Sequence, residues 1–347
     1  MNLRRPPLLR SGALPSARRR AVAGLTAVGL ASVALTGCTV EPPTPAPEPP
    51  TVAAVVSVAQ ERKILDRVSG VVEGTTKAGD AGSLAARLTG PALAMREAEL
   101  DVAASGNTDA LSDLSMRMQQ LVPASDPQWP RTSYAITEQP PDQTTPTLMA
   151  FEQDSARGQY KLWGWVRLVP DIAMPRFAEA NLGSAAVPED DTSLKVTPRD
   201  AIKRYASVLS VDEDSKYAAD FRDDYLRRLV RRSGETQLAA IEHKDGKGTF
   251  EVAYQPTKDP VKAVRTVDGG ALVLAAMRSQ ETLTAEENWE LGPLAPSAKA
   301  LWGDAKRTNV MRIVYRDTVA LYVPPAGSAE PISLLGHHRV PYAVSNS

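Results

Sequence analysis

The chain has 347 residues, with 40 Lys and Arg against 41 Asp and Glu, and its formal net charge at pH 7 is −1. This near balance lacks the large positive charge that nucleic acids and anionic membrane surfaces attract, so we expect no nucleic-acid partner. The single cysteine, Cys38, excludes a disulfide within the chain, and the fold must therefore be stabilised by burial.

The N-terminal segment has the features of an export signal. Six arginines and no acidic residue accompany an apolar run at residues 21–34 that is short for a bilayer span. Residues 35–38 are Leu-Thr-Gly-Cys and resemble the lipoprotein signal, in which an apolar residue and two small residues precede an invariant cysteine. The resemblance implies a signal peptide over residues 1–37, cleavage between Gly37 and Cys38, and acylation of Cys38. The alternative is a plain secretory peptide or an N-terminal membrane helix.

A proline-rich segment follows, and we assign residues 38–52 to the lipidated cysteine and a spacer. The run from Glu41 to Pro50 favours extended polyproline II, which would hold the folded part roughly 30 Å from the bilayer. Removal of residues 1–37 leaves 34 basic against 41 acidic residues, a net charge of −7. We therefore expect attachment to the outer face of the cell membrane through acyl chains on Cys38 and not through surface charge.

Residues 53–170 are predicted to form a first α+β module. Apolar residues recur at helical spacing over residues 53–76, and Pro91 suits the first turn of a helix that continues to about residue 103. The pattern then changes to the alternation typical of strands. The predicted strands are residues 132–138, 147–153 and 160–168.

The third of these strands contains the feature that we single out for binding. Strict alternation along residues 160–168 would place Trp163 and Trp165 on one face, together with Lys161 and Arg167. Two indoles on a shared face indicate an aromatic binding surface for a cavity ligand or a protein partner. The alternative, which we favour, is a contact within the core or between modules.

Residues 171–196 have the composition of a linker, after which helical signals restart. Thr197 and Asp200 frame a capping signature with proline at the first helical position. A second helix is predicted at about residues 215–232. The residues expected on its apolar side are Ala218, Phe221, Tyr225, Leu229 and Val230. Acid-first pairs spaced by four residues are expected to support this helix: Asp223 with Arg227, and Asp224 with Arg228.

Strand patterns then return and complete a second α+β module over residues 197–345. We expect the charged dipeptide Arg316-Asp317 to form the turn of a hairpin between two of these strands. The predicted strands are residues 249–254, 271–278, 310–315, 318–323 and 332–340.

Helices followed by antiparallel strands, twice, predict an α+β fold of two tandem domains, each with N-terminal helices packed on a curved antiparallel sheet. This pattern resembles the cone-shaped fold of the nuclear-transport-factor-2-like (NTF2-like) and cystatin-like superfamilies, and a family of uncharacterised lipoproteins of high-GC Gram-positive bacteria. The resemblance covers most of the chain after residue 55 and implies fold and location, with no catalytic residue. It is carried by Trp129-Pro130-Arg131, by residues 156–165, and by Thr197-Pro198 with the helix that contains Tyr205.

Residues that could carry chemistry are few. Histidine occurs only as His243, His337 and His338, and the last two, adjacent on a predicted strand, should point to opposite faces and so not share a metal ion. The acidic run at residues 212–214 lacks the glycine and distal glutamate of a calcium loop, and we expect a solvated turn. Neither a nucleophile elbow nor a phosphate-binding loop motif is found. We therefore predict no metal, no cofactor and no catalytic residue.

These observations favour a membrane-anchored, non-enzymatic binding or accessory protein of the cell envelope, with an envelope protein or a small molecule as its partner. Two alternatives stay open. A solute-binding lipoprotein of an importer would need two lobes with alternating strands and helices. An envelope enzyme would need paired acids with raised pKa values in one cavity.

Overall fold

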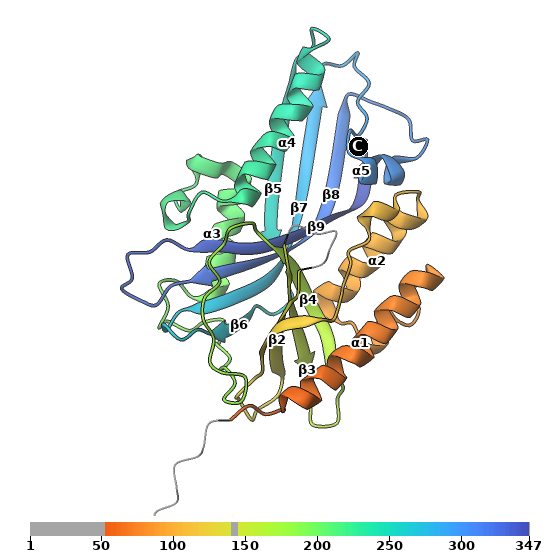
Figure 1. The fold of residues 1–347 in the computed structure, drawn as a ribbon. Helices are drawn as coiled ribbons and strands as arrows, with labels where there is room; N and C mark the ends of the chain where they lie inside the picture. Colours follow the sequence, from red (N-terminus) through yellow and green to blue (C-terminus); the bar gives the residue numbers. More distant parts are fainter. Residues whose placement is uncertain (1–52, 140–144, 347) are drawn as a thin grey trace, which may run out of the picture. The chain divides into compact units, whose positions relative to one another are not determined.

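A single antiparallel sheet organises the part of the protein that the structure describes (Figure 1). This computed structural model describes residues 53–139 and 145–346. The predicted signal peptide at residues 1–37, the cleavage and lipidation site at Gly37 and Cys38, and the spacer at residues 38–52 all lie outside the described residues.

The sheet has nine strands, and all pairings between named strands are antiparallel. Eight of them follow one another in the order β1, β2, β3, β4, β9, β8, β7 and β5, while β6 pairs with β7 beside β5. The strands are β1 (Met118–Val122), β2 (Arg131–Thr137), β3 (Thr147–Gln153), β4 (Lys161–Leu168), β5 (Gly248–Pro256), β6 (Lys262–Arg265), β7 (Ala271–Ala285), β8 (Val310–Val323) and β9 (Ser333–Ser345).

Helices cover both faces of this sheet (Figure 1). α1 and α2 pack on one face, against β2, β3 and β4 and the end of β9, whereas α3 and α4 pack on the other face, against β5, β7 and β8. The short α5 packs against β9 and the end of α2. The helices are α1 (Val58–Ala78), α2 (Gly90–Ala104), α3 (Pro198–Val211), α4 (Tyr225–Glu242) and α5 (Pro296–Trp302).

The predicted α+β class is confirmed, whereas two tandem cone-shaped domains are not. The strands of the two predicted modules continue into one sheet, because Arg167 and Leu168 of β4 pair with His337 and Gly336 of β9. The described residues accordingly belong to one compact unit. The predicted linker at residues 171–196 contacts both halves of the sheet, since Ser184 bridges to Ala124 and Ala186 bridges to Val264.

Helix starts follow their capping residues. The predicted cap at Thr197 is confirmed, because its hydroxyl accepts a hydrogen bond from the Asp200 amide at 3.2 Å. The predicted helix at residues 215–232 is wrong at its start: α4 begins at Tyr225, because the Asp224 carboxylate accepts from the Arg227 amide at 3.0 Å. Asp224 therefore acts as a cap and not as a partner for Arg228.

The predicted hairpin at Arg316-Asp317 is also wrong. β8 runs without a turn from Val310 to Val323, and the two charged residues lie in its middle, opposite Arg278 and Met277 of β7. Their side chains point to opposite faces of the sheet. Asp317 is buried and accepts a hydrogen bond from Ser279 at 2.7 Å, so a polar partner in the neighbouring strand lets a carboxylate remain inside the sheet.

Candidate functional site

A cavity of about 470 Å³ lies where the two halves of the sheet meet, and we call it the junction cavity. β4 pairs with β9 at only two positions before the strands part. Gly336 permits this contact, since a Cβ at that position would lie 2.6 Å from the carbonyl oxygen of Arg167. The lining of the junction cavity includes Arg167, Tyr225, Leu229, Tyr315, His337 and Arg339, together with one acid, Asp109.

α4 supplies the apolar edge of the junction cavity. Tyr225 and Leu229 are one helical turn apart and are 42% and 36% exposed, whereas their neighbours Leu226 and Val230 are buried. Of the residues predicted on the apolar side of this helix, Val230 is buried in the core, whereas Tyr225 and Leu229 line the cavity. Large, partly exposed apolar side chains beside a cavity are typical of binding surfaces.

His337 presents a neutral imidazole to the junction cavity. Its ring lies 5.7 Å from the ring of Tyr225, and its Nδ1 is buried without a hydrogen-bond partner in the described part of the chain. Burial lowers the pKa of His337 to about 4, and the positive charges of Arg339 and Arg167 nearby act in the same direction. At neutral pH the ring is therefore uncharged, with one nitrogen as a hydrogen-bond donor and the other as an acceptor.

Arg167 supplies an available positive charge. Its side chain is exposed at the mouth of the junction cavity and forms no ion pair or hydrogen bond through its guanidinium among residues 53–139 and 145–346. His337 stands directly opposite it in the sheet. An unpaired guanidinium beside a neutral imidazole and a tyrosine ring suits a ligand that combines an anionic group with an apolar part.

Behind the cavity lies a buried ion cluster that we call the strand network, formed by Ser279, Glu281, Tyr315, Asp317 and Arg339. Arg339 contacts Glu281 at 2.8 Å and Asp317 at 3.3 Å, and its guanidinium carbon lies 3.5 Å from the ring centre of Tyr315. Burial, and the nearby charge of Glu281, raise the pKa of Asp317 to about 6 even though Arg339 opposes the shift. Two acids thus share one cation.

A second buried cluster, the helix network, lies on the opposite face of β9 and consists of Arg96, Glu99, Ser112 and His338. Glu99 is fully buried and is contacted by Arg96 at 2.6 Å, by the Ser112 hydroxyl at 2.5 Å and by His338 Nε2 at 2.9 Å. Burial alone would raise the pKa of Glu99, but His338, Arg96 and Ser112 together lower it. The prediction that His337 and His338 point to opposite faces is confirmed.

The structure does not bring Trp163 and Trp165 to a shared face. Ala150 of β3 pairs with Gly164 of β4 and Phe151 pairs with Leu162, so a β-bulge leaves Trp163 of β4 without a partner in β3 and changes the alternation along β4. Each indole is 2% exposed, and the two belong to different core clusters on opposite faces of the sheet. The prediction of a shared face is therefore wrong, and a binding role for either indole stays a prediction.

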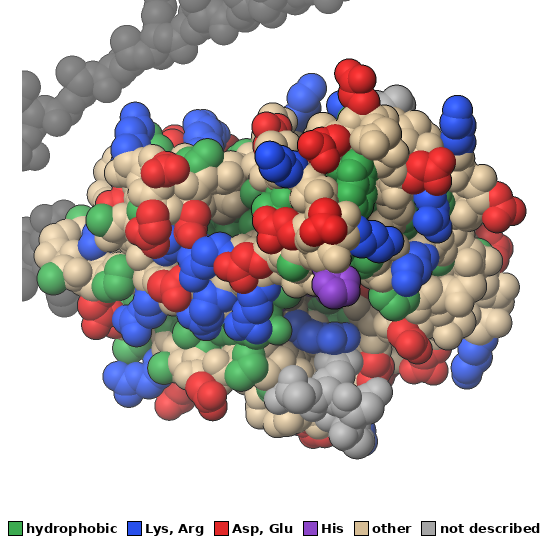
Figure 2. Space-filling view, turned by 90° about the horizontal axis from the view of Figure 1, so that it is seen from above, with side chains coloured by type: hydrophobic (Ala, Val, Ile, Leu, Met, Phe, Trp, Pro, Cys, Tyr) green, Lys and Arg blue, Asp and Glu red, His purple; other side chains and the backbone are tan. Residues whose placement is uncertain are grey.

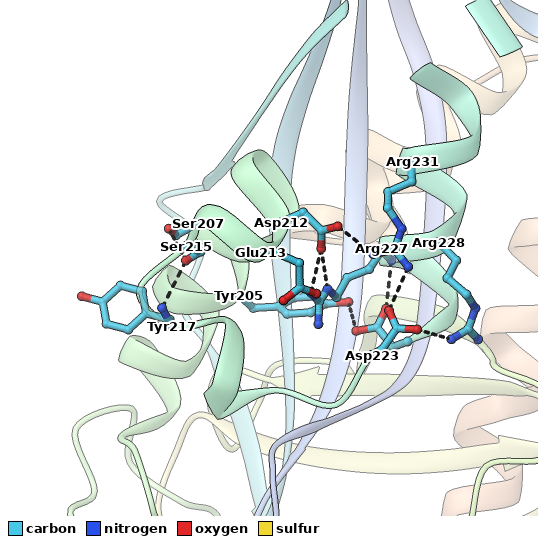
Figure 3. A network of polar contacts seen from close by, with 11 residues as sticks. Tyr205, Ser207, Asp212, Glu213, Ser215, Tyr217, Asp223, Arg227, Arg228 and Arg231 are labelled. Atoms are coloured by element: carbon cyan, nitrogen blue, oxygen red, sulfur yellow. Dashed lines mark hydrogen bonds and ion pairs between the residues drawn. The ribbon is translucent and has the colours of Figure 1, made fainter. Parts of the chain in front are cut away.

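A polar network ties the C-terminal end of α3 to the start of α4 (Figure 3). The buried Arg227 contacts Asp212 and Glu213, each at 2.7 Å, and Arg231 contacts Asp212 at 2.7 Å. These ion pairs lower the pKa of Asp212 despite its partial burial. The acidic turn is exposed at Glu213 and Asp214, as expected of a solvated turn, and its ion pairs also hold two helices together. Among the described residues, no group of three or more potential ligands could hold a metal ion.

Two further observations concern the surface and the helices. On the face seen in Figure 2, acidic and basic side chains lie next to one another, with hydrophobic side chains between them. In the part of the chain that the structure describes, no helix is long and apolar enough to cross a membrane.

These features define an α+β protein with one large antiparallel sheet and a polar cavity at the junction of its halves. The chain belongs to the family described as Domain of unknown function (DUF8094), whose model matches residues 52–340. It is 27% identical over 261 residues to an uncharacterized lipoprotein of Streptomyces coelicolor, covering 74% of this chain and 77% of that protein. An uncharacterized lipoprotein of Streptomyces avermitilis is 28% identical over 260 residues, covering 73% and 75%. No solved structure matches.

Proposed function

We propose that this protein is a lipoprotein anchored to the outer face of the cell membrane, where it acts as a non-enzymatic binding or accessory module. The Leu-Thr-Gly-Cys segment ending at Cys38 and the lipoprotein names of two relatives support the anchor. Acyl chains on Cys38 would confine the folded part to the membrane surface without a spanning helix.

The observation that carries the binding role is the junction cavity. It combines exposed apolar side chains, Tyr225 and Leu229, with the unpaired charge of Arg167 and the neutral ring of His337. Cavities with apolar walls and a few converging polar groups, placed where two parts of a fold meet, are the usual form of ligand sites. We expect the occupant to be a partner segment or a small molecule with an anionic group.

The state of the buried acids favours binding over catalysis. Asp317 and Glu281 meet one condition for an enzyme, since they lie close together and the pKa of Asp317 is raised to about 6. However, Glu281 accepts hydrogen bonds from Arg339 and the Tyr315 hydroxyl, and Asp317 accepts one from Ser279. Oδ1 of Asp317 has no hydrogen-bond partner among the described residues, but it lies 3.3 Å from Nε of the buried Arg339. Acids held by a buried cation and by hydroxyl donors in this way favour a structural role over proton transfer to a ligand.

The sheet favours an accessory role over solute binding for an importer. That class needs lobes with alternating strands and helices, and hence parallel strands, whereas all nine strands here pair antiparallel.

The test is photo-crosslinking in cells with the full-length, lipidated protein. A photoreactive amino acid would replace Leu229 at the junction cavity, and in a control it would replace Val267, which is 58% exposed on a loop and does not line this cavity. We expect one dominant crosslinked species from position 229, reduced strongly by Arg167→Gln and absent from position 267. The same species from both positions would contradict a binding role for the cavity.

The anchor is tested separately. The Cys38→Ala protein should no longer be found in the membrane fraction, from which detergent extracts the acylated protein. The substitution should also abolish metabolic labelling of the protein with a clickable fatty acid. Labelling that persists in Cys38→Ala would overturn the assignment of the acylated residue.

A further inference from the structure

Two arginines face each other on the side of the sheet that α2 covers. Arg278 of β7 and Arg316 of β8 are directly opposite in the antiparallel register, so their side chains leave the same face of the sheet. Opposite positions of this kind place Cβ atoms about 5 Å apart, and like charges there destabilise the pair. An anion bound between the two guanidinium groups would remove this repulsion.

Neither arginine has an acidic partner in the structure. Within residues 53–139 and 145–346, the guanidinium groups of Arg278 and Arg316 form no ion pair and no hydrogen bond, and Nε of Arg316 is buried. The adjacent Asp317 does not compensate, because its carboxylate lies on the opposite face with Ser279 and Arg339. The two positive charges are therefore left without a counter-ion.

A bulge in β9 places an aromatic ring against both guanidinium groups. Val314 pairs with Ala343 and Tyr315 with Pro341, which leaves Tyr342 as an extra residue in β9. The guanidinium carbon of Arg316 lies 4.5 Å, and that of Arg278 lies 5.9 Å, from the ring centre of Tyr342. Contact with this ring orients both side chains without using their N–H donors.

The two guanidinium groups and Tyr342 line a cavity of about 230 Å³, which is separate from the junction cavity. Pro91 and Met95 of α2 form its apolar wall. Two acids belong to its lining: Asp259, which accepts a hydrogen bond from the Thr257 hydroxyl at 2.7 Å and lies beside Gly90 at the start of α2, and Asp317, whose carboxylate contacts Ser279 and Arg339 on the opposite face of the sheet. With Asp317 directed away, the two arginines and Asp259 leave one net positive charge on the side chains of the lining.

We propose that this cavity is an oxyanion-binding site that takes a phosphoryl group between Arg278 and Arg316. Arginine donates paired N–H groups that match the oxygens of phosphate, and a phosphate monoester carries a charge of about −1.5 to −2 at pH 7, which balances two guanidinium groups. The apolar wall from α2 and the ring of Tyr342 then contact the group that bears the phosphate. The volume admits a phosphoryl group with a small substituent.

The test compares variants of the full-length, acylated protein in phosphatidylcholine vesicles, with inorganic phosphate as the probe and acetate and chloride as reference anions. Arg278→Gln and Arg316→Gln should each weaken phosphate binding by about tenfold or more, the loss expected for one charge-assisted contact. Arg157→Gln serves as the matched control, since Arg157 is exposed on the loop between β3 and β4. It should bind phosphate like the unaltered protein.

A second readout separates this site from a general effect of phosphate on stability. In phosphate-free buffer, Arg278→Gln should raise the midpoint of thermal unfolding, because it removes the repulsion between two like charges. Added phosphate should then raise the midpoint for the unaltered protein and the control, but not for Arg278→Gln. Equal responses in all variants, or no response of the unaltered protein to phosphate, would overturn the proposal.

The source of the phosphoryl group is distinguished by adding phosphatidylglycerol to the vesicles. If a lipid headgroup is the natural occupant, phosphatidylglycerol should compete with inorganic phosphate and should protect the backbone around Tyr342 from hydrogen exchange, in a manner that Arg316→Gln abolishes. If phosphate binding is unaffected by phosphatidylglycerol, the occupant is a soluble phosphate compound. Because this site is separate from the junction cavity, its failure would leave the proposed function untouched.

Discussion

The strand network and the helix network lie back to back on β9, and they differ in their balance of charge. Adjacent residues of this strand enter them: Arg339 belongs to the strand network and His338 to the helix network. The strand network has two acids, Glu281 and Asp317, for one arginine. The helix network has one acid, Glu99, facing an arginine and a histidine.

This difference sets opposite responses to pH. Where acids exceed cations, burial prevails and one carboxyl holds its proton more tightly, as the raised pKa of Asp317 shows. Where a single acid faces an arginine, a histidine and a hydroxyl, the carboxylate is stabilised despite burial, as the lowered pKa of Glu99 shows. Burial is nearly complete in both cases, so the count of neighbouring charges decides the direction of the shift.

The largest expected effect comes from removing the arginine of each network. Arg339→Met leaves two buried acids without a cation and should lower the free energy of unfolding by roughly 3–5 kcal/mol at pH 7. Arg96→Met should cost less, because Glu99 has no second acid beside it in this network and keeps its contacts with the Ser112 hydroxyl and His338 Nε2. Urea unfolding at pH 7 measures both, with the exposed Arg157→Met as a control. Equal losses in the two variants would show that charge balance does not govern these networks.

A smaller effect is expected from Asp317→Asn, which keeps the acceptor for Ser279 but removes one of the two acids. The pKa of Asp317 is about 6 when folded against 3.8 as its ordinary value, so the native state binds more protons between these pH values and loses stability as pH rises through them. The variant lacks this loss. Its stability relative to the unaltered protein should increase from pH 4 to pH 7 by at most about 3 kcal/mol.

Urea unfolding at a series of pH values gives that difference directly. A difference that stays constant from pH 4 to pH 7 would contradict the raised pKa of Asp317.

The smallest effect should come from His338→Gln in the helix network. Glutamine can still donate to Glu99, so the loss at pH 7 should be about 1 kcal/mol. The lowered pKa of Glu99 means that its contribution to stability is present above its ordinary pKa of 4.5 and is lost as pH falls through the folded value. Without His338 that pKa should rise, and the acid-side loss of stability should begin at higher pH. If the variant and the unaltered protein lose stability over the same range of low pH, His338 is excluded as a cause of the lowered pKa of Glu99.

Local signals predicted much of the secondary structure. The strand predicted at residues 147–153 has the bounds of β3, and the helix predicted from Pro91 to about residue 103 lies within α2. Thr197 caps α3 as its sequence indicates. These features depend on neighbouring residues alone, through side-chain alternation and the fixed geometry of caps.

The residues of the candidate sites could not be predicted in the same way. Arg316-Asp317 has the composition of a turn, yet it lies inside β8. The two side chains lie on opposite faces of the sheet, where Asp317 contacts Ser279 and Arg339 and Arg316 contacts the ring of Tyr342. Trp163 and Trp165 follow an alternation that a bulge in the pairing with β3 interrupts. The register of a strand and the position of a bulge depend on both strands of a pair. They therefore cannot be predicted from the sequence of one strand alone.

The sequence by itself determined the candidate anchor at Cys38, the α+β class, and most helices and strands, because each of these depends on composition or short-range spacing. Only the tertiary structure decided that the strands of both halves form one sheet, that a cavity opens where β4 and β9 part, and that Arg278 lies opposite Arg316. Those outcomes depend on contacts between residues far apart in the chain, whose energies arise from burial, register and charge balance in the assembled sheet.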